Sequence, residues 1–409
     1  MPKSSRTIFA ALYHNELEKL WAHRGKSLII AFLIIVVGGV LLVWHSNQQQ
    51  QASMKSTIVS EQQQIVQLRR QEARASGQQK QQIAAQIQNT KSLVRQMQAQ
   101  NGAINVKQQI KQLKVSVSHL PRLQRGQGLE MLAQYRAMRA HGIVWYNPGV
   151  NNGLKLVGDL FASAAMLIFA LVAVGVSSDR VSSELESGTW GMLLLHAPRR
   201  IPVYLAKLFA SITVTWSFMV AAALGYLGLG SALMGVGNAS IPIVVGVHLK
   251  QGPGNGMPPI IPVQVFHTIS QGSYDLVALG FAMVSMAAMI AISIALSMLT
   301  RSTVFSLIVS AVLVISGQLS MVVARTAGWL AVSDPAVHLP LMADWTGNLG
   351  LQFDLPALNL PTGLTVVTVW AVAAVLVGAG RSCHQPNPGD PGISVDRSTV
   401  PPGAADGTL

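Results

Sequence analysis

Six long stretches without a charged residue constrain this 409-residue chain more than any other feature. A helix needs about 17–25 mostly apolar residues to cross the hydrocarbon core of a bilayer, and each stretch is close to that length or longer. The stretches cover residues 28–44, 160–176, 208–234, 276–300, 302–324 and 363–380. Their number argues against the buried helices of a soluble protein. We therefore expect an all-α polytopic membrane protein with six transmembrane helices, in which Arg301 occupies a tight turn between the fourth and the fifth.

Lysine and arginine residues predict the orientation of these helices, because the cytoplasmic loops of membrane proteins carry an excess of them. If the N-terminus is cytoplasmic, the inside segments hold twelve of these residues, whereas the short outside loops hold only Lys250 and Arg325. The twelve are Lys3, Arg6, Lys19, Arg24, Lys26, Arg180, Arg199, Arg200, Lys207, Arg301, Arg381 and Arg397. Both termini are therefore expected in the cytoplasm, with the chain in a bacterial plasma membrane.

The segment between the first two stretches, residues 45–155, carries nearly all of the excess positive charge. It holds fifteen basic residues against three acidic ones, Glu61, Glu72 and Glu130, which gives +12 of the formal net charge of +13. The predicted topology places this segment outside the membrane. Nucleic acid is therefore not expected as a partner, despite the basic composition.

Composition also favours helices in this outer segment. Residues 48–127 include 23 glutamines and no proline before Pro121, and Gln, Lys, Arg and Ala are good helix formers. Apolar residues recur three and four positions apart, as in packed helices. They are Ile58, Ile65, Leu68, Ile83, Ile87, Val94, Met97 and Ile104. We expect a coiled-coil-like extracytoplasmic insert, an antiparallel helical hairpin that turns near Asn101 and Gly102. A disordered Gln-rich linker is the alternative.

Two further outer segments and the tail have a different composition. Residues 235–272 and 327–362 are rich in proline and glycine, and the second contains Trp329, Pro335 and Trp345. Such residues are typical of interfacial or re-entrant segments. Residues 381–409 show no apolar periodicity, so we expect a disordered cytoplasmic tail.

No pattern in the sequence indicates catalysis. The single cysteine, Cys383, excludes an internal disulfide and a cysteine-cluster metal site. The sequence from Arg24 to Ser27 ends like a P-loop, but Leu20 replaces the glycine that a P-loop needs five residues before Gly25. The six stretches also lack the ionisable residues of proton- or sodium-coupled carriers. This absence favours a pathway for an apolar or amphipathic cargo that is powered from elsewhere.

The cytoplasmic loop of residues 178–207 carries the most specific pattern in the chain. An acidic pair, Glu184 and Glu186, precedes a Gly-Thr dipeptide and a leucine-rich turn, and a proline and basic residues follow. The other residues of the pattern are Gly188, Thr189, Leu193, Leu194, Pro198, Arg199, Arg200 and Lys207. This loop resembles the signature loop of type-2 ABC transporter permeases, and the resemblance implies that it couples the membrane subunit to an ATPase.

The N-terminal segment is similar to the same family. Residues 1–27 are expected to form a cytoplasmic amphipathic helix that leads into the first span, and its family-like residues are Glu16, Leu17, Leu20 and Trp21. Glu16 interrupts an apolar stripe on this helix, which indicates a polar partner at that position. A plain interfacial anchor is the alternative. The resemblance covers residues 8–380 and extends to subfamilies with a helical insert between the first two spans.

The residues of the loop predict a lever independently of the resemblance. We expect a short amphipathic helix over residues 184–195 that docks in a groove of a soluble partner and ends before Pro198. An ordinary connector between two membrane helices is the alternative.

The resemblance implies the permease subunit of an ATP-driven ABC exporter. A separate soluble ABC ATPase would bind ATP and Mg, this chain would hold no cofactor, and a second permease subunit would complete a homodimer or heterodimer in the lipid bilayer. The cargo would be a drug, a peptide antibiotic, a lipid-like compound or an ion. A non-transporting scaffold or envelope-stress receptor that uses the outer coiled coil is the alternative. The expected segments are residues 1–27, 28–44, 45–155, 156–380 and 381–409.

Overall fold

Among the residues that the computed structural model describes, six helices are long and apolar enough to cross a membrane. They lie in Ile8–Glu72, Met166–Glu186, Arg200–Met234, Gln271–Thr300, Thr303–Val322 and Leu360–Cys383. The expected all-α class with six spans is therefore confirmed. The structure describes residues 5–100, 104–119, 125–147, 151–163, 165–189, 200–251, 260–263, 267–300, 302–324, 327–353 and 355–384. Arg301 and the tail after residue 384, for which a tight turn and disorder were expected, lie outside this part of the chain.

One continuous helical segment leads from the N-terminal segment through the first span and beyond it. It consists of α1 (Ser5–Leu33), a wider π-helical turn η1 (Ile34–Gly38) and α2 (Gly39–Glu72). Tyr226 of α10 (Arg200–Met234) donates a hydrogen bond of 3.0 Å from its hydroxyl to the carbonyl oxygen of Ile35. A Cβ atom at Gly39 would overlap this hydroxyl. A side chain that inserts into the backbone ladder distorts a helix locally, so Tyr226 accounts for the wider turn and Gly39 permits its approach.

Beyond the first span, α2 forms one side of an antiparallel helical hairpin. α3 (Gln78–Gln100) packs against α2 through Ile65, Ile87 and Val94. The turn between the two helices covers residues 73–77, where Gly77 has a φ of +58° that favours glycine. Asn101 and Gly102, at which we expected the turn, lie outside the described residues. The expected position of the turn was wrong, because α2 already ends at Glu72 and the returning helix α3 begins at Gln78.

A second helical hairpin follows in the outer segment. α4 (Val106–His119) packs against α5 (Arg125–Ala140) around a core of Val106, Ile110, Leu132, Tyr135 and Met138. Two short strands, β1 (Ile104–Asn105) and β2 (Trp145–Tyr146), pair antiparallel at the foot of this hairpin. The hairpin core therefore consists of apolar residues from both helices.

The transmembrane bundle is arranged around α11 (Gln271–Thr300), which is buried along most of its length. Its neighbours are α6 (Gly153–Ala162), α7 (Met166–Ser177), α10, α12 (Thr303–Val322) and α16 (Leu360–His384). Small side chains of α11, such as Ala278, Ala282 and Ser285, are buried at these contacts and permit close helix packing. The helix α1 lies along α10.

The second uncharged stretch does not form one continuous helix. α6 ends at Ala162 and α7 begins at Met166, and Ser163 between them has extended backbone angles. Its hydroxyl accepts a hydrogen bond of 3.3 Å from the backbone N–H of Ala165. A serine side chain that bonds to nearby backbone competes with the helix ladder, and this explains a break that hydropathy alone does not predict.

The two outer loops differ from each other. The first contains antiparallel strand pairs, β3 (Pro242–Val245) with β6 (His267–Ser270) and β4 (His248–Gln251) with β5 (Ile260–Val263). The second contains three short helices, α13 (Gly328–Ser333), α14 (Leu341–Trp345) and α15 (Asn348–Phe353). The helix α14 packs against α11 and α16, so part of this loop is enclosed by the bundle.

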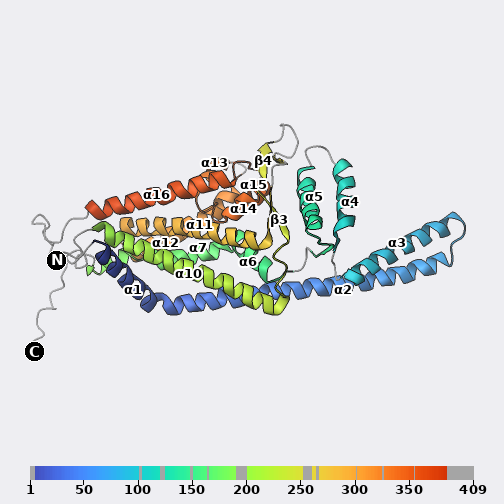
Figure 1. Ribbon diagram of the computed structural model, residues 1–409, viewed down its shortest axis with the longest axis horizontal. Coiled ribbons are helices and arrows are strands. Elements are labelled where there is room, and N and C mark those ends of the chain that lie inside the picture. The colour runs from blue at the N-terminus through green and yellow to red at the C-terminus, as the bar shows by residue number, and fades with distance from the viewer. Residues whose placement is uncertain are drawn as a thin grey trace, which may run out of the picture.

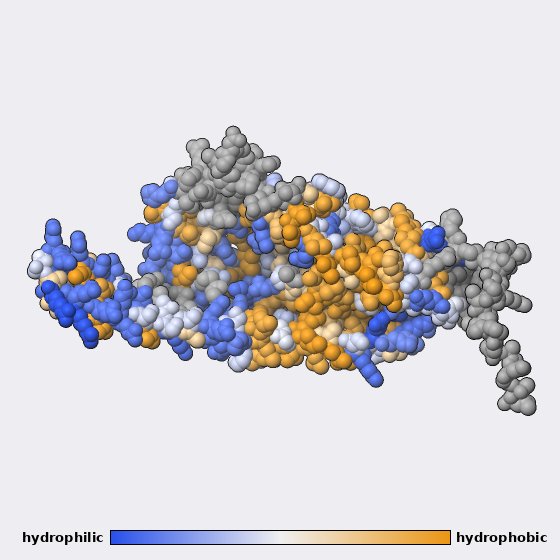
Figure 2. All heavy atoms as spheres, turned by 180° about the vertical axis from the view of Figure 1, so that it is seen from behind, coloured by the Kyte–Doolittle hydropathy of each residue, from blue (hydrophilic) through white to orange (hydrophobic). Residues whose placement is uncertain are grey.

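The molecule is elongated, with the helix bundle at one end and the α2–α3 hairpin at the other (Figure 1). α1 begins and α16 ends at the same end of the bundle, opposite the hairpin. Figure 2 shows apolar residues gathered over the bundle and hydrophilic residues over the hairpins. This division matches a membrane-embedded bundle with a water-exposed outer part.

Candidate coupling site

The short helix α8 (Ser182–Glu186) follows α7 in the chain and contacts the first part of α10. α10 begins at the bundle end opposite the α2–α3 hairpin (Figure 1). Both of its predicted acidic residues make polar contacts within the chain. Glu184 points toward α1 and α10, whereas Glu186 points toward α12. The helix α8 therefore lies between two groups of membrane helices.

Four charged residues from three helices form a cluster that we call the basal ion cluster: Glu16 and Lys19 of α1, Glu184 of α8 and Lys207 of α10. The Nζ atom of Lys207 lies 2.7 Å from Oε1 of Glu184 and 3.1 Å from Oε2 of Glu16. The Nζ atom of Lys19 lies 3.4 Å from Oε1 of Glu184 and 3.2 Å from Oε1 of Glu16. Each lysine thus joins both carboxylates, and the cluster has no net charge.

Two members of the basal ion cluster are almost completely buried. The side chain of Lys207 is 0% exposed and that of Glu16 is 4% exposed, so each needs an opposite charge at hydrogen-bonding distance. Arg180 is close enough to interact electrostatically with Glu16 and Glu184. Asp179 forms a separate ion pair with Arg24 of α1. The loop that leads into α8 is therefore held against α1 by a second contact.

Glu186 holds the other side of α8. Its Oε1 atom accepts a hydrogen bond of 2.8 Å from the backbone N–H of Thr303, and its Oε2 atom accepts one of 2.6 Å from the Thr303 hydroxyl. Thr303 is the first residue of α12. A carboxylate at a helix N-terminus satisfies a free backbone N–H and favours the positive end of the helix dipole. Glu186 is therefore an N-terminal cap of α12 supplied from α8.

Serine hydroxyls attach the start of α8 to the bundle. Ser297 of α11 accepts hydrogen bonds from the backbone N–H groups of Val181 and Ser182, at 3.1 and 2.9 Å from its Oγ atom. Ser306 of α12 donates a hydrogen bond of 2.5 Å from its Oγ atom to the carbonyl oxygen of Ser178. Ser297 lies in an uncharged stretch of the sequence, so no sequence signal marked its role.

The Gly-Thr dipeptide terminates α8. Gly188 has a φ of +71°, a conformation that favours glycine, and its N–H donates to the carbonyl oxygen of Leu185 at 3.3 Å. The hydroxyl oxygens of Thr189 and Ser187 lie 2.9 Å apart in a hydrogen bond. The expectation of one continuous helix over residues 184–195 was therefore wrong, because residues 187 and 188 form a turn.

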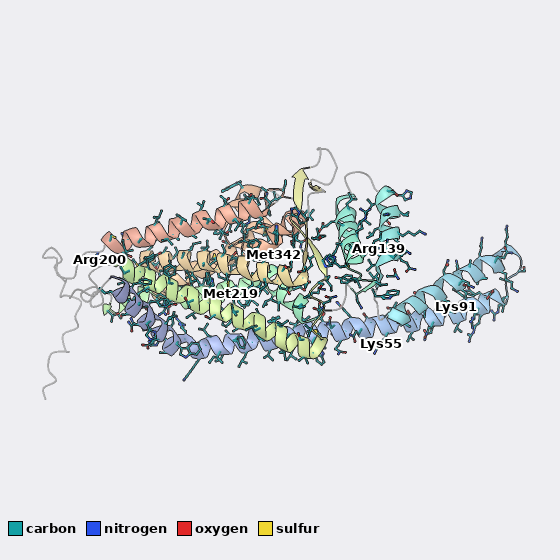
Figure 3. All side chains as sticks on the ribbon, in the orientation of Figure 1. Lys55, Lys91, Arg139, Arg200, Met219 and Met342 are labelled. Atoms are coloured by element: carbon teal, nitrogen blue, oxygen red, sulfur yellow. The ribbon has the colours of Figure 1, made fainter. Side chains whose placement is uncertain are left out.

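The remaining predicted site residues have different positions. Leu193, Leu194, Pro198 and Arg199 lie outside the described residues. Arg200 donates hydrogen bonds of 3.3 Å from Nη1 to the carbonyl oxygens of Ser382 and Cys383, at the C-terminal end of α16, where a cation is favourable. Figure 3 shows Arg200 at this end of the bundle.

The predicted residues of α1 divide between its two faces. Glu16 and Leu20 are buried against the bundle, Leu17 is partly buried, and Trp21 is 62% exposed. The polar partners of Glu16 are Lys207 and Lys19, within the same chain. Thr303 and Arg180 were missed by the sequence analysis, although Ser302 and Thr303 carry the signal of a helix start after an uncharged stretch.

The sequence pattern of one family, described as ABC-2 family transporter protein, matches residues 10–379. The chain belongs to this family. A search of curated proteins and a search of solved structures found no match. As an ABC-2 family transporter protein, the chain is an integral membrane protein and a permease subunit of an ABC transporter. The match includes α1 from residue 10, the basal ion cluster and α16 up to residue 379, so the site belongs to the family region.

Proposed function

We propose that α8 receives the movement of a separate soluble ABC ATPase and transmits it to the membrane helices. The observation that carries the proposal is the double attachment of α8: Glu184 contacts α1 and α10, and Glu186 caps α12. A displacement of α8 therefore acts on the first, third and fifth spans together. An element that is packed against several helices can couple distant sites if it has two discrete positions, and we propose that the ATPase moves α8 between two such positions.

The exposed residues of this end provide the surface for the ATPase. Ser187, Thr189 and Trp21 are exposed, whereas the carboxylate of Glu184 faces the cluster. We propose that these residues, continued in the sequence by Leu193, Leu194, Pro198 and Arg199, contact a groove of the ATPase. The role of Glu184 is then to hold α8 in position.

ATP and Mg²⁺ would bind to the ATPase subunits, and a second permease subunit, identical or different, would complete the pathway. Closure of the ATPases on ATP shifts the helices only if the inward- and outward-open states bind the ATPases differently. The start of α1 and the end of α16 lie at the same bundle end (Figure 1), and the excess of Lys and Arg in the inside segments supports placing this end in the cytoplasm of the bacterial cell.

The proposed cargo is an apolar or amphipathic compound, such as a drug, a peptide antibiotic or a lipid-like molecule. A cavity of about 220 Å³ lies beside the break between α6 and α7 and is also lined by α12 and α15. Met166, Met321 and Phe353 contribute apolar surface, and Gln318 and Asn348 contribute amide groups. Mostly apolar lining with a few polar groups is typical of sites for small organic ligands.

The proposal can be tested by co-expression with a candidate soluble ABC ATPase from the same organism. In a Cys383→Ser background, Ser187→Cys should crosslink to the ATPase with a short bifunctional maleimide, and ATP should change the yield. Gln79→Cys, exposed at the tip of the α2–α3 hairpin, is the matched control and should not crosslink. If the ATPase neither co-purifies nor crosslinks through Ser187→Cys, the proposed docking surface is wrong.

A further inference from the structure

The α4–α5 hairpin carries a basic groove that the coupling function does not use. The groove has a volume of about 350 Å³, and its lining consists of Ile110 and Lys114 of α4 with Arg136, Arg139 and Ala140 of α5. Three of these five residues are cationic. Figure 3 shows Arg139 on α5, far from Arg200 and the coupling end of the bundle. The groove is therefore separate from the candidate coupling site.

The packing of the hairpin holds the three cations around the groove. Lys114 follows the core residue Ile110 by one helical turn, so both lie on the same side of α4. Arg136 and Arg139 each directly follow a core residue of α5. The cations therefore flank the packed contact between the helices, one from α4 and two from α5.

The surrounding sequence supplies almost no negative charge to this groove. Glu130 is the only acidic residue between residues 73 and 158, whereas seven basic residues lie between 104 and 147. Glu130 is not among the described residues that line the groove. Burial also raises the pKa of Glu130, which disfavours its charged form. Three like charges around one groove repel each other, and a bound anion would remove this repulsion.

We propose that the groove between α4 and α5 binds a phosphate group through Lys114, Arg136 and Arg139. Guanidinium groups bind phosphate oxygens in pairs, and a lysine adds a point charge. Ile110 and Ala140 provide apolar surface beside the cations, which suits the carbon atoms of a phosphate ester. The phosphate can belong to an anionic lipid headgroup or to a soluble phosphate compound, and the binding chemistry is the same.

The first experiment uses the unmodified full-length protein in phosphatidylcholine vesicles. The acetylation rates of Lys114 and of Lys55, an exposed lysine on α2, are measured by mass spectrometry. Phosphatidylglycerol in the vesicles, or added glycerol phosphate, should slow acetylation at Lys114 by about tenfold or more relative to Lys55. Protection by the lipid alone identifies a headgroup site, and protection by glycerol phosphate also identifies a site for soluble phosphate. Equal slowing at both lysines, or none, overturns the proposal.

The second experiment compares two variants that lose the same charge from the same residue types. The groove variant is Lys114→Gln with Arg136→Gln and Arg139→Gln, and the control is Lys55→Gln with Arg69→Gln and Arg70→Gln, all exposed on α2. Each cation contributes about fivefold to phosphate affinity, so the loss of three should lower the affinity of the groove variant on the order of 100-fold. The affinity of the control should fall only slightly. Equal losses would show diffuse attraction and overturn the site. The protection measurement needs no variant, so it decides the question even if the groove variant does not fold.

Discussion

Lys207 of α10 and Glu16 of α1 are 191 positions apart in the chain, yet the Nζ atom of Lys207 lies 3.1 Å from Oε2 of Glu16 and both side chains are buried. The pair connects the helix that leads into the first span with the helix that begins the third. Loss of one charge from a buried pair leaves the other charge uncompensated, which destabilises a protein more than loss of the whole pair.

Lys207→Met should therefore lower the stability of the protein by about 3 kcal/mol, because Glu16 and Glu184 both lose a cation. Adding Glu16→Gln should restore part of this stability, since Lys19 alone cannot balance both carboxylates and the amide removes the excess negative charge. Thermal unfolding of the purified protein in detergent measures both effects. Lys26→Met, at an exposed position of α1, is the control; if Lys207→Met is as stable as this control, the buried pair is not important for stability.

The two residues of this pair also show how much the sequence could predict. Glu16 was marked because it interrupts an apolar stripe, and Lys207 because it ends the family-like loop. Their contact depends on how α1 packs on α10, and no local periodicity specifies that packing. Hydropathy predicted the six spans because length and apolar composition are local properties. The π-helical turn at Ile34–Gly38 depends on Tyr226 from another helix and was not predictable in this way.

The outer segments show the same limit. Good helix formers with apolar residues three and four positions apart predicted helices between the first two spans, but the turn at Gly77 was placed too late in the chain. The pairing of β3 with β6 was missed, although the β-branched residues Ile243, Val244 and Val245 are typical of a strand. Residues 242–245 of β3 pair with residues 267–270 of β6, which lie more than twenty positions later in the chain. The proline-rich composition of this segment does not reveal such a long-range contact.

The contact between Glu186 and Thr303 should matter more for coupling than for stability. Glu186→Ala and Thr303→Val should each reduce the transport-stimulated ATPase activity of the reconstituted complex by about fivefold. The double variant should be no worse than Glu186→Ala alone, because Thr303→Val removes only the hydroxyl bond of the same contact and keeps the backbone N–H bond. Glu18→Ala, at an exposed position of α1, should have no effect. Additive losses in the double variant would show that the two residues act separately.

The predicted topology can be tested with single cysteines in a Cys383→Ser background. A membrane-impermeant maleimide added to intact cells should label Gln79→Cys in the α2–α3 hairpin and should not label Ser187→Cys until the cells are opened. Both positions are exposed in the structure, so burial does not explain a difference between them. Labelling of position 187 but not of position 79 in intact cells would reverse the orientation.

Gly363 of α16 lies against a buried, hydrogen-bonded His–Asp pair in the second outer loop. His338 and Asp344 are fully buried, with 2.8 Å between Nδ1 and Oδ2, and a Cβ atom at Gly363 would overlap Oδ2 of Asp344. Gly363→Ala should therefore destabilise the protein by about 2 kcal/mol through overpacking. The matched control is Gly280→Ala in α11, where an added Cβ meets no atom within 4 Å. A Gly363→Ala protein that unfolds at the same temperature as this control would contradict the close approach of α16.

The outer hairpins should tolerate acid, because glutamine does not titrate and few carboxylates are present. Glu130 allows a test in α5. Burial raises its pKa above the ordinary value of 4.5, so the folded hairpin favours the protonated form. Protonation of Glu130 therefore stabilises the folded hairpin. This stabilisation is complete below about pH 4.5, the ordinary pKa, and is lost as the pH rises through the higher pKa of the folded state.

The α4–α5 hairpin should therefore be more stable at pH 4 than at pH 7, and Glu130→Gln should remove this difference, because the amide keeps the shape and carries no charge. Hydrogen exchange of the α5 amides in the full-length protein, corrected for the intrinsic exchange rates, measures the local opening free energy. The amides of α3 provide an internal reference, since Gln78–Gln100 contains no carboxylate. Weaker protection of α5 at pH 4 than at pH 7, or an unchanged pH dependence in Glu130→Gln, would show that the burial of Glu130 does not control the response of this hairpin to acid.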